Sequence, residues 1–260
     1  MNVSMADAFD LSWKLTYVLF GLTPDPQALL ATHVHDRYQN AENLLDLDKR
    51  WYESKYANRN GIRPDDGVIG QEMFSFVCGL TVEYDEGFLV DAKASGPQGA
   101  GIITSGNNMM GALKEGMRLP DVLMMRLADE APLHMQDEVT IDGKYRIIAF
   151  LSPNQNPSWH TAETILNDIV PRYPAKVVKP LFIINEDFHT VDWDILPRVV
   201  HDKAEMDVFC ATQEMRDMYA VDMEKGALVV VRPDQVVGSI ARLEDTEKIK
   251  AYLGRVLTTV

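Results

Sequence analysis

Apolar residues recur at helical spacing through most of the first 79 residues. Two stretches rich in Pro, Gly, Asn and Asp interrupt this spacing. Helices are therefore expected before, between and after the interruptions, and the middle helix is long. The three predicted helices run from about Met5 to near Gly21, from about Pro26 to about Tyr56, and from Val68 to Cys78.

Beyond Gly116 the pattern changes to short β-branched runs that are bounded by turn residues, which is typical of core strands. The order is β-α-β and then β-β-α, which is that of a thioredoxin-like domain. The predicted strands lie at 144–152, 175–185, 226–234 and 236–241, and the predicted helices lie at 161–173, where Pro171 ends the helix, and at 244–257.

Residues 80–116 carry many glycines and little periodicity, which indicates a loop-rich connection. We therefore place a domain boundary near residue 79, between a helical part (1–79) and a thioredoxin-like domain (80–260). The predicted fold class is α/β, with helices first and then a mixed sheet flanked by helices.

The first helix has almost no chain in front of it. Ser4 and Asp7 stand in the S-x-x-D relation of a capping box, so the helix is expected to start at about Met5. Asp7 is interpreted as a cap in preference to a partner for a basic group of an absent domain. The apolar stripe of this helix is long and continuous, which predicts a substantial neighbour. We expect that a further segment normally precedes it.

Charge and composition narrow the function classes. The formal net charge is -14, and both nucleic acids and anionic membranes require a cationic face, so neither is an expected partner. The sequence has neither a leader pattern nor a run long enough to span a membrane, and a cytoplasmic location is the default.

Few residues suggest site chemistry on their own. Cys78 and Cys210 are far apart and in no metal-ligand spacing, so we interpret both as buried hydrophobes and expect no metal site. His33 and His35, at i,i+2 spacing, point to different faces of a helix and are interpreted as a surface pair. The segment from Arg232 to Asp234 is interpreted as a turn and not as a site.

The opening segment, MNVSMADAFDLSWKL, resembles the flavin-contacting segment of the flavoprotein aromatic hydroxylases, close to the phenol 2-monooxygenase type. In that family a Met-Asn pair puts backbone N–H groups at a helix N-terminus against the pyrimidine edge of the FAD ring. The resemblance implies that Met1, Asn2 and Val3 contact flavin. Three later positions match the same motif, namely Asp7, Trp13 and Lys14.

The resemblance continues along the chain. LLATHVHDRYQNAENLLDLDKRW is similar to the family's second helix, with Tyr and Glu of the usual pattern replaced by His33 and Val34. LTVEYDEGFLV, GMRLPD, DGKYRIIAF and VVVRPDQVVG resemble the family's C-terminal thioredoxin-like domain, to which dimerisation is ascribed. The second-helix residues that fit the pattern are Thr32, Asp36, Arg37 and Asp48.

One expected motif is missing from the chain. The G-x-G-x-x-G fingerprint that holds the FAD pyrophosphate does not occur, because GPQGAG at 96–101 has other spacing and no strand before it. The family's substrate pocket also lies upstream of the Met-Asn pair. The resemblance therefore implies that this chain is the C-terminal portion of a longer flavoprotein, and we assign it no catalytic residue.

Two functions remain open at this stage. The first is an FAD-dependent monooxygenase that hydroxylates a phenolic or related aromatic substrate with NADPH and O2, represented by a portion that is not expected to act alone. The second is a non-catalytic thioredoxin-like module that forms a homodimer and lacks the C-x-x-C of redox relatives. A peroxiredoxin-like reading of GMRLPD fails because no cysteine follows in the next helix.

Overall fold

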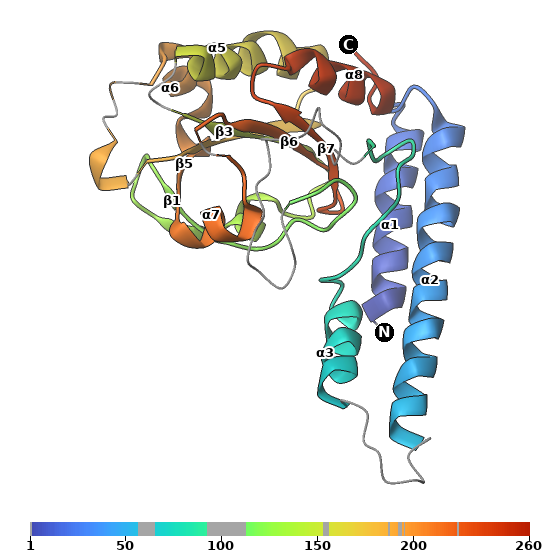
Figure 1. Cartoon of the computed structure of the whole chain (residues 1–260). Coiled ribbons are helices and arrows are strands. Elements are labelled where there is room, and N and C mark those ends of the chain that lie inside the picture. Colours follow the sequence, from blue (N-terminus) through green and yellow to red (C-terminus); the bar gives the residue numbers. More distant parts are fainter. Residues whose placement is uncertain are drawn as a thin grey trace.

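The computed structural model describes residues 2–56, 66–92, 113–152, 156–186, 188–191, 194, 196–222 and 224–260. Helices make up its N-terminal part, and a mixed α/β unit follows (Figure 1). The helices are α1 (Asn2–Leu19), α2 (Pro26–Tyr56), α3 (Asp66–Val77), α4 (Met135–Glu138), α5 (Asn156–Thr164), α6 (Arg198–Ala204), α7 (Gln213–Tyr219) and α8 (Thr246–Val256).

Seven strands of the described residues form one sheet in the order β2-β1-β5-β4-β3-β6-β7. The central strands β3, β4 and β5 are parallel, and β6 and β7 form an antiparallel hairpin beside β3. The bounds are β1 (Leu123–Arg126), β2 (Pro132–His134), β3 (Tyr145–Leu151), β4 (Val178–Ile184), β5 (Val208–Ala211), β6 (Ala227–Val231) and β7 (Val237–Arg242).

Helices cover both faces of the sheet. α5, α6 and α8 lie over one face and α7 lies over the other (Figure 1). Alternate residues of β3 supply the two cores: Ile147 and Ala149 belong to the cluster under α5 and α8, while Ile148 and Phe150 belong to the cluster on the α7 side. All seven residues of β3 are buried, which explains why its sequence is apolar except for Arg146, whose charge is paired with Asp142.

α1 and α2 run side by side along one end of the sheet unit, and α3 returns beside them (Figure 1). The inner side of α1 packs on the sheet unit through aromatic rings. The Trp13 ring meets the rings of Tyr17 and Tyr145 edge-on, with centroid distances of 5.4 and 6.4 Å. The Tyr17 hydroxyl donates a 2.6 Å hydrogen bond to the carbonyl of Gly143. The helical part and the sheet unit therefore share one buried cluster.

The expected fold class is confirmed. The long middle helix matches α2, and the four predicted strands match β3, β4, β6 and β7. The sequence reading missed β1, β2 and β5, which have four, three and four residues, together with the short helices α4, α6 and α7. Of the loop-rich segment 80–116, residues 93–112 lie outside the described residues, as does the GPQGAG stretch.

The helix predicted at 161–173 begins earlier and changes type. It starts as α5 at Asn156, continues as a π-helical turn (Ile165–Ile169), and ends in a 3-10 turn (Val170–Arg172) that holds Pro171. Two further 3-10 turns are Phe188–Thr190 and Glu205–Asp207. No helix among the described residues is both long enough and apolar enough to cross a membrane.

Candidate functional site

The residues that the resemblance assigns to flavin lie at the start of α1. Met1 is outside the described residues, Asn2 is the first residue of α1, and Val3 is half-buried in the first turn. The first N–H groups of an α-helix have no acceptor within the helix, and they form the positive end of its dipole. Because the neighbouring Ser4 and Met5 are exposed, this end can donate hydrogen bonds to an electron-rich ligand edge.

The predicted capping box of Ser4 and Asp7 is wrong. α1 already begins at Asn2, and the Asp7 carboxylate accepts a hydrogen bond from Nε of Arg37 in α2. A guanidinium offers a carboxylate a stronger, charge-assisted bond than a backbone amide does. Nη1 of Arg37 also donates to the hydroxyl of Tyr84 at 3.0 Å. Arg37 therefore ties α1 and α2 to the segment that follows α3.

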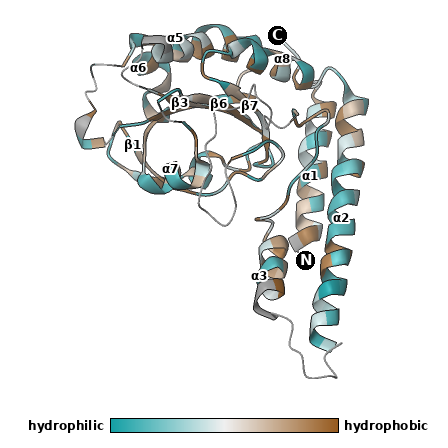
Figure 2. Ribbon diagram, in the orientation of Figure 1, coloured by the Kyte–Doolittle hydropathy of each residue, from teal (hydrophilic) through white to brown (hydrophobic). Residues whose placement is uncertain are grey.

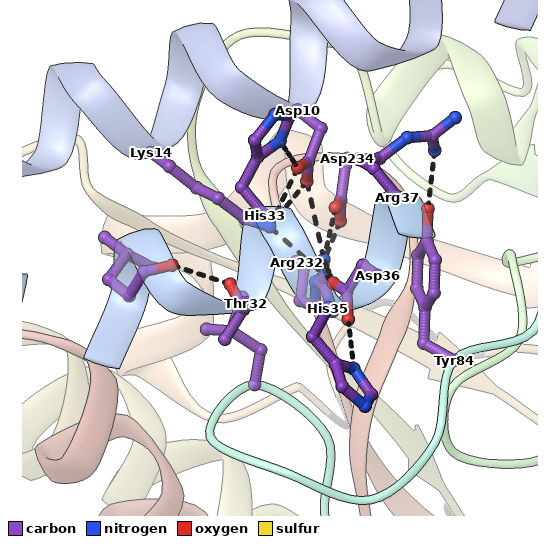
Figure 3. A network of polar contacts seen from close by, with 12 residues as sticks. Asp10, Lys14, Thr32, His33, His35, Asp36, Arg37, Tyr84, Arg232 and Asp234 are labelled. Atoms are coloured by element: carbon purple, nitrogen blue, oxygen red, sulfur yellow. Dashed lines mark hydrogen bonds and ion pairs between the residues drawn. The ribbon is translucent and has the colours of Figure 1, made fainter. Parts of the chain in front are cut away.

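A buried group of charges lies deeper in the same junction, where α1, α2 and the turn between β6 and β7 meet (Figure 3). We call it the Arg232 cluster. Its side chains come from positions far apart in the sequence, and Arg232 and Asp36 are 196 positions apart. The cluster consists of Asp10, Lys14, His33, Asp36, Arg232 and Asp234.

On the α1 side, Asp10 and Lys14 form an i,i+4 ion pair that is almost fully buried. The Lys14 ammonium lies 2.8 Å from one carboxylate oxygen of Asp10 and 3.6 Å from a carboxylate oxygen of Asp36. Nδ1 of His33 lies 2.6 Å from the other oxygen of Asp10. These contacts lock the third and fourth turns of α1 against α2.

On the sheet side, the Arg232 guanidinium forms a two-pronged pair with Asp234, at 3.0 and 2.5 Å. Its Nη2 also lies 3.4 Å from Asp36 and 3.9 Å from Asp10. The rings of Trp13 and Tyr84 lie 5.9 and 5.3 Å from the guanidinium carbon, within cation–π range. One buried cation therefore contacts both helices and its own turn.

Burial and charge shift the acidities in this junction. Burial lowers the pKa of Lys14, and the Arg232 charge lowers it further, against the opposing effect of Asp10. Burial alone would lower the pKa of Arg232, but the carboxylates of Asp234 and Asp36 outweigh burial and hold that pKa well above its ordinary value. Burial, reinforced by Asp234, raises the pKa of Tyr84 to about 12.

The structure corrects two further expectations from the sequence. His35 is exposed, as expected, but His33 is only 23% exposed and contacts Asp10, because it lies on the face of α2 that meets α1. The turn at Arg232 is confirmed between β6 and β7, yet the side chain of Arg232 is fully buried. One signal in the sequence could have indicated this buried group of charges. Asp10 and Lys14 are spaced i,i+4 and fall on the same inner face of α1 as Trp13.

The other residues of the family pattern behave differently. Thr32 donates its hydroxyl to the carbonyl of Leu29, and Asp48 is exposed on the far half of α2. Cys210 is buried in β5 as expected, whereas Cys78 is half-buried because it follows the end of α3, which packs on α2 from one side. Among the described residues, no group of three or more His, Cys, Asp or Glu is arranged to hold a metal ion.

Two hollows of the described residues are large enough to note, and one of them adjoins this junction. One of about 330 Å³ opens between α2 and the segment 85–90, with Asp36 and Arg232 in its lining beside Asp85 and Glu86. Its carboxylates make it unsuited to an anion. The other, of about 600 Å³, lies on the sheet unit and is mostly apolar; its lining includes Leu80, Arg118, Ile141 and Met218.

Comparison with known proteins assigns the chain to a family. A family model described as phenol hydroxylase, C-terminal dimerisation domain, matches residues 82–260. The match covers β1 to β7 and α4 to α8, and it begins after α1, α2 and α3.

Curated relatives match almost the whole chain, α1 and α2 included. The flavin-dependent oxygenase ucdD of Aspergillus ustus is 28% identical over 100% of this chain and 41% of its own length. The 3-hydroxybenzoate 4-monooxygenase of Comamonas testosteroni is 26% identical over 97% of this chain and 42% of its own length. The chain therefore spans less than half the length of these relatives.

A solved structure shares the fold of this chain. It is a ternary complex of aklavinone-11 hydroxylase with FAD and aklavinone, with a TM-score of 0.59 over 98% of this chain and 39% of that chain. Its sequence identity of 20% means that the likeness shows the fold alone. Because the family model covers more than half of the sequence, this chain belongs to the phenol hydroxylase C-terminal dimerisation domain family.

Proposed function

We propose that this chain is the C-terminal portion of an FAD-dependent monooxygenase that hydroxylates a phenolic or related aromatic substrate with NADPH and O2. One observation carries the proposal: relatives named as a flavin-dependent oxygenase and a 3-hydroxybenzoate 4-monooxygenase match 100% and 97% of the chain. The likeness therefore includes α1 and α2, which lie outside the dimerisation-domain match at 82–260.

Within this proposal the N-terminal end of α1 contacts the flavin. The residues are Met1, Asn2 and Val3, and their part is to bind and orient the ring through backbone N–H groups. The free donors and positive dipole of a helix N-terminus fit the electron-rich pyrimidine edge of FAD. When bound, FAD supplies the oxygen chemistry, and the protein contributes position and the exclusion of water.

The outer face of α1 is uncharged and exposed, which favours a further portion of protein that packs against it. Leu19 and the residue that follows α1, Phe20, are 80% and 74% exposed. Exposed apolar side chains stand out here because the molecule as a whole is strongly acidic. The hydroxyls of Ser12 and Thr16 on this face donate to helix carbonyls, those of Ala8 and Ser12, instead of projecting outward. The exposed residues of α1 are Ser4, Met5, Ala6, Ala8, Ser12, Leu15, Thr16 and Leu19, none of them charged. Such a face is typical of a surface that another element covers.

The homodimer and the cytoplasmic location belong to the same proposal. The family description names dimerisation, which favours a second copy of this chain as the partner. Both cysteines are free thiols, and free thiols are typical of a reducing compartment.

The alternative is a non-catalytic dimerisation module. It is favoured by the absence of C-x-x-C in the sequence and by the burial of Cys210, which leave the sheet unit without dithiol chemistry. On this alternative the chain forms a folded dimer and binds no flavin.

A titration of the purified chain with FAD, followed by flavin fluorescence and absorbance, tests the choice. Stoichiometric binding supports the flavin role of α1. Absence of binding by a folded dimer, established by sedimentation, means that this portion cannot turn over alone and acts in isolation as the dimerisation module.

Val3→Glu sharpens this titration. A carboxylate in the first turn stabilises a helix but repels the electron-rich flavin edge, so the affinity for FAD should fall at least about tenfold. The matched control is Val34→Glu, at a residue that is 69% exposed in the first half of α2, and it should leave the affinity unchanged. If the two substitutions lowered the affinity for FAD equally, the proposed contact between α1 and flavin would be contradicted.

A further inference from the structure

Arg232 belongs to the sheet unit, but most of its surroundings belong to the helices. It follows β6 directly and is held by Asp234 of its own turn. Its remaining carboxylate neighbours are Asp36 of α2 at 3.4 Å and Asp10 of α1 at 3.9 Å. Figure 3 shows these side chains converging on the guanidinium. The arrangement is a direct electrostatic link between the sheet unit and α1.

The link permits little variation in geometry. The guanidinium is fully buried and lies near the rings of Trp13 and Tyr84. Three carboxylates (Asp10, Asp36 and Asp234) face the cations Lys14 and Arg232, with His33 at the edge. Buried charges lose much stability when a partner moves away, because water does not replace it. A shift of α1 relative to the sheet unit would therefore separate Arg232 from Asp10 and leave this buried group of charges less well paired.

Holding Asp10 also fixes the first turn of α1. An α-helix is stiff and rises about 1.5 Å per residue, so Val3 lies roughly 10 Å from Asp10 along the axis of α1. Lys14, one turn beyond Asp10, is bound to the same cluster, so both the position and the rotation of the helix are set.

We propose that Arg232 is a positioning residue: through Asp36 and Asp10 it sets the placement of α1 on the sheet unit, and with it the helix end that binds flavin. The flavin part rests on the proposed function, whereas the placement of α1 does not. The C-terminal domain thus supplies more than a dimer contact, because it orients an element of the flavin site.

Amide hydrogen exchange of the whole chain tests the placement of α1. Arg232→Met, which keeps an unbranched apolar stem and removes the charge, should speed exchange in α1 at least about tenfold relative to β3 and β4. The matched control is Arg146→Met. Arg146 is equally buried and paired with Asp142 at 3.0 Å, and its hydrogen bonds reach only residues 138–144. Because Tyr17 of α1 bonds the carbonyl of Gly143 in that same loop, this control should raise the ratio of α1 exchange to sheet exchange far less than Arg232→Met does.

A rescue variant separates positioning from simple loss of stability. Asp36→Asn in the Arg232→Met background removes one of the stranded carboxylates, so α1 exchange should return at least halfway toward the wild type. Arg232→Lys keeps a cation but not the two-pronged pair, and should give an intermediate ratio. Two results would overturn the proposal. One is a ratio of α1 exchange to sheet exchange that is the same for Arg232→Met and Arg146→Met. The other is faster α1 exchange in the double variant than in Arg232→Met alone.

The flavin consequence has its own readout. With FAD added, Arg232→Met should weaken binding at least about tenfold and alter the circular dichroism of the bound flavin, while Arg146→Met should have a much smaller effect on both. If wild-type chain binds no FAD, the proposed function of α1 fails, but the exchange ratios still decide the placement. If wild-type chain binds and Arg232→Met leaves affinity and dichroism unchanged, the role toward flavin is overturned.

Discussion

The sheet core and the junction between α1 and the sheet are both buried, but they are built from different interactions. Every residue of β3 is buried, and apolar neighbours surround it on both faces of the sheet (Figure 2). The junction combines aromatic rings with a cluster of buried ion pairs. Apolar packing is non-directional and tolerates small shifts, whereas buried ion pairs demand one geometry. The comparison indicates that the sheet core supplies stability and the junction supplies alignment.

The largest effect is expected where the two kinds of interaction meet. Trp13→Ala removes a ring that packs on Tyr17 and Tyr145 and lies beside Arg232. The free energy of unfolding should fall by about 3–5 kcal/mol, measured by urea denaturation. The control Ile148→Ala, on the far face of β3, should cost about 2–5 kcal/mol without loosening α1. A cost below about 1 kcal/mol for Trp13→Ala would show that α1 is not anchored by its rings.

A similar but charge-dependent effect is expected at Lys14. Lys14→Met fills the same space but leaves Asp10 and Asp36 with one cation fewer, so the free energy of unfolding should fall by about 3 kcal/mol. The double variant Asp10→Asn with Lys14→Met should be more stable than Lys14→Met alone, because one uncompensated charge is gone. If the losses in the free energy of unfolding from Asp10→Asn and Lys14→Met simply added in thermal or urea unfolding, Asp10 and Lys14 would not act as a coupled pair.

The sequence predicted the sheet core better than it predicted the junction, and the reason is physical. β3 and β4 have seven residues each between turn residues, and a single charged residue, Arg146 or Lys179, interrupts an otherwise apolar sequence, which is a local pattern. β5 was missed because its four apolar residues, VFCA, are too few to distinguish a strand from a helix segment. Local patterns therefore identify long central strands and pass over short ones.

The Arg232 cluster could not be predicted in the same way. Arg232 follows an apolar strand and precedes Pro-Asp, which is ordinary turn chemistry in the sequence. Its partner Asp36 lies 196 positions earlier on a helix rich in charges. Nothing local separates Asp36, which is 5% exposed, from its exposed neighbour His35. Only the packing of α1 and α2 on the sheet unit brings these charges together.

A smaller, pH-dependent effect is expected at Tyr84. Tyr84→Phe removes the bond to Arg37, so the variant should be about 1 kcal/mol less stable near pH 7. The folded-state pKa of Tyr84 is raised to about 12, above the unfolded value of about 10. Its contribution is therefore complete below pH 10 and is lost as the pH rises through 12. Urea unfolding from pH 8 to 12 should show that the difference in the free energy of unfolding between the wild type and Tyr84→Phe shrinks as the pH rises. A difference that stays constant over this range would contradict the prediction.

The smallest effect on stability is expected on the outer face of α1. Leu19 is 80% exposed, so Leu19→Lys should change the free energy of unfolding by less than about 0.5 kcal/mol. The matched substitution Leu29→Lys, at a residue only 1% exposed, should cost several times more, because it buries an unpaired charge. A large cost at Leu19 in urea unfolding at low protein concentration would mean that this face is already packed within one chain. With no such cost, the inner face of α1 serves the junction and the outer face remains available to another element of protein, as the proposed function requires.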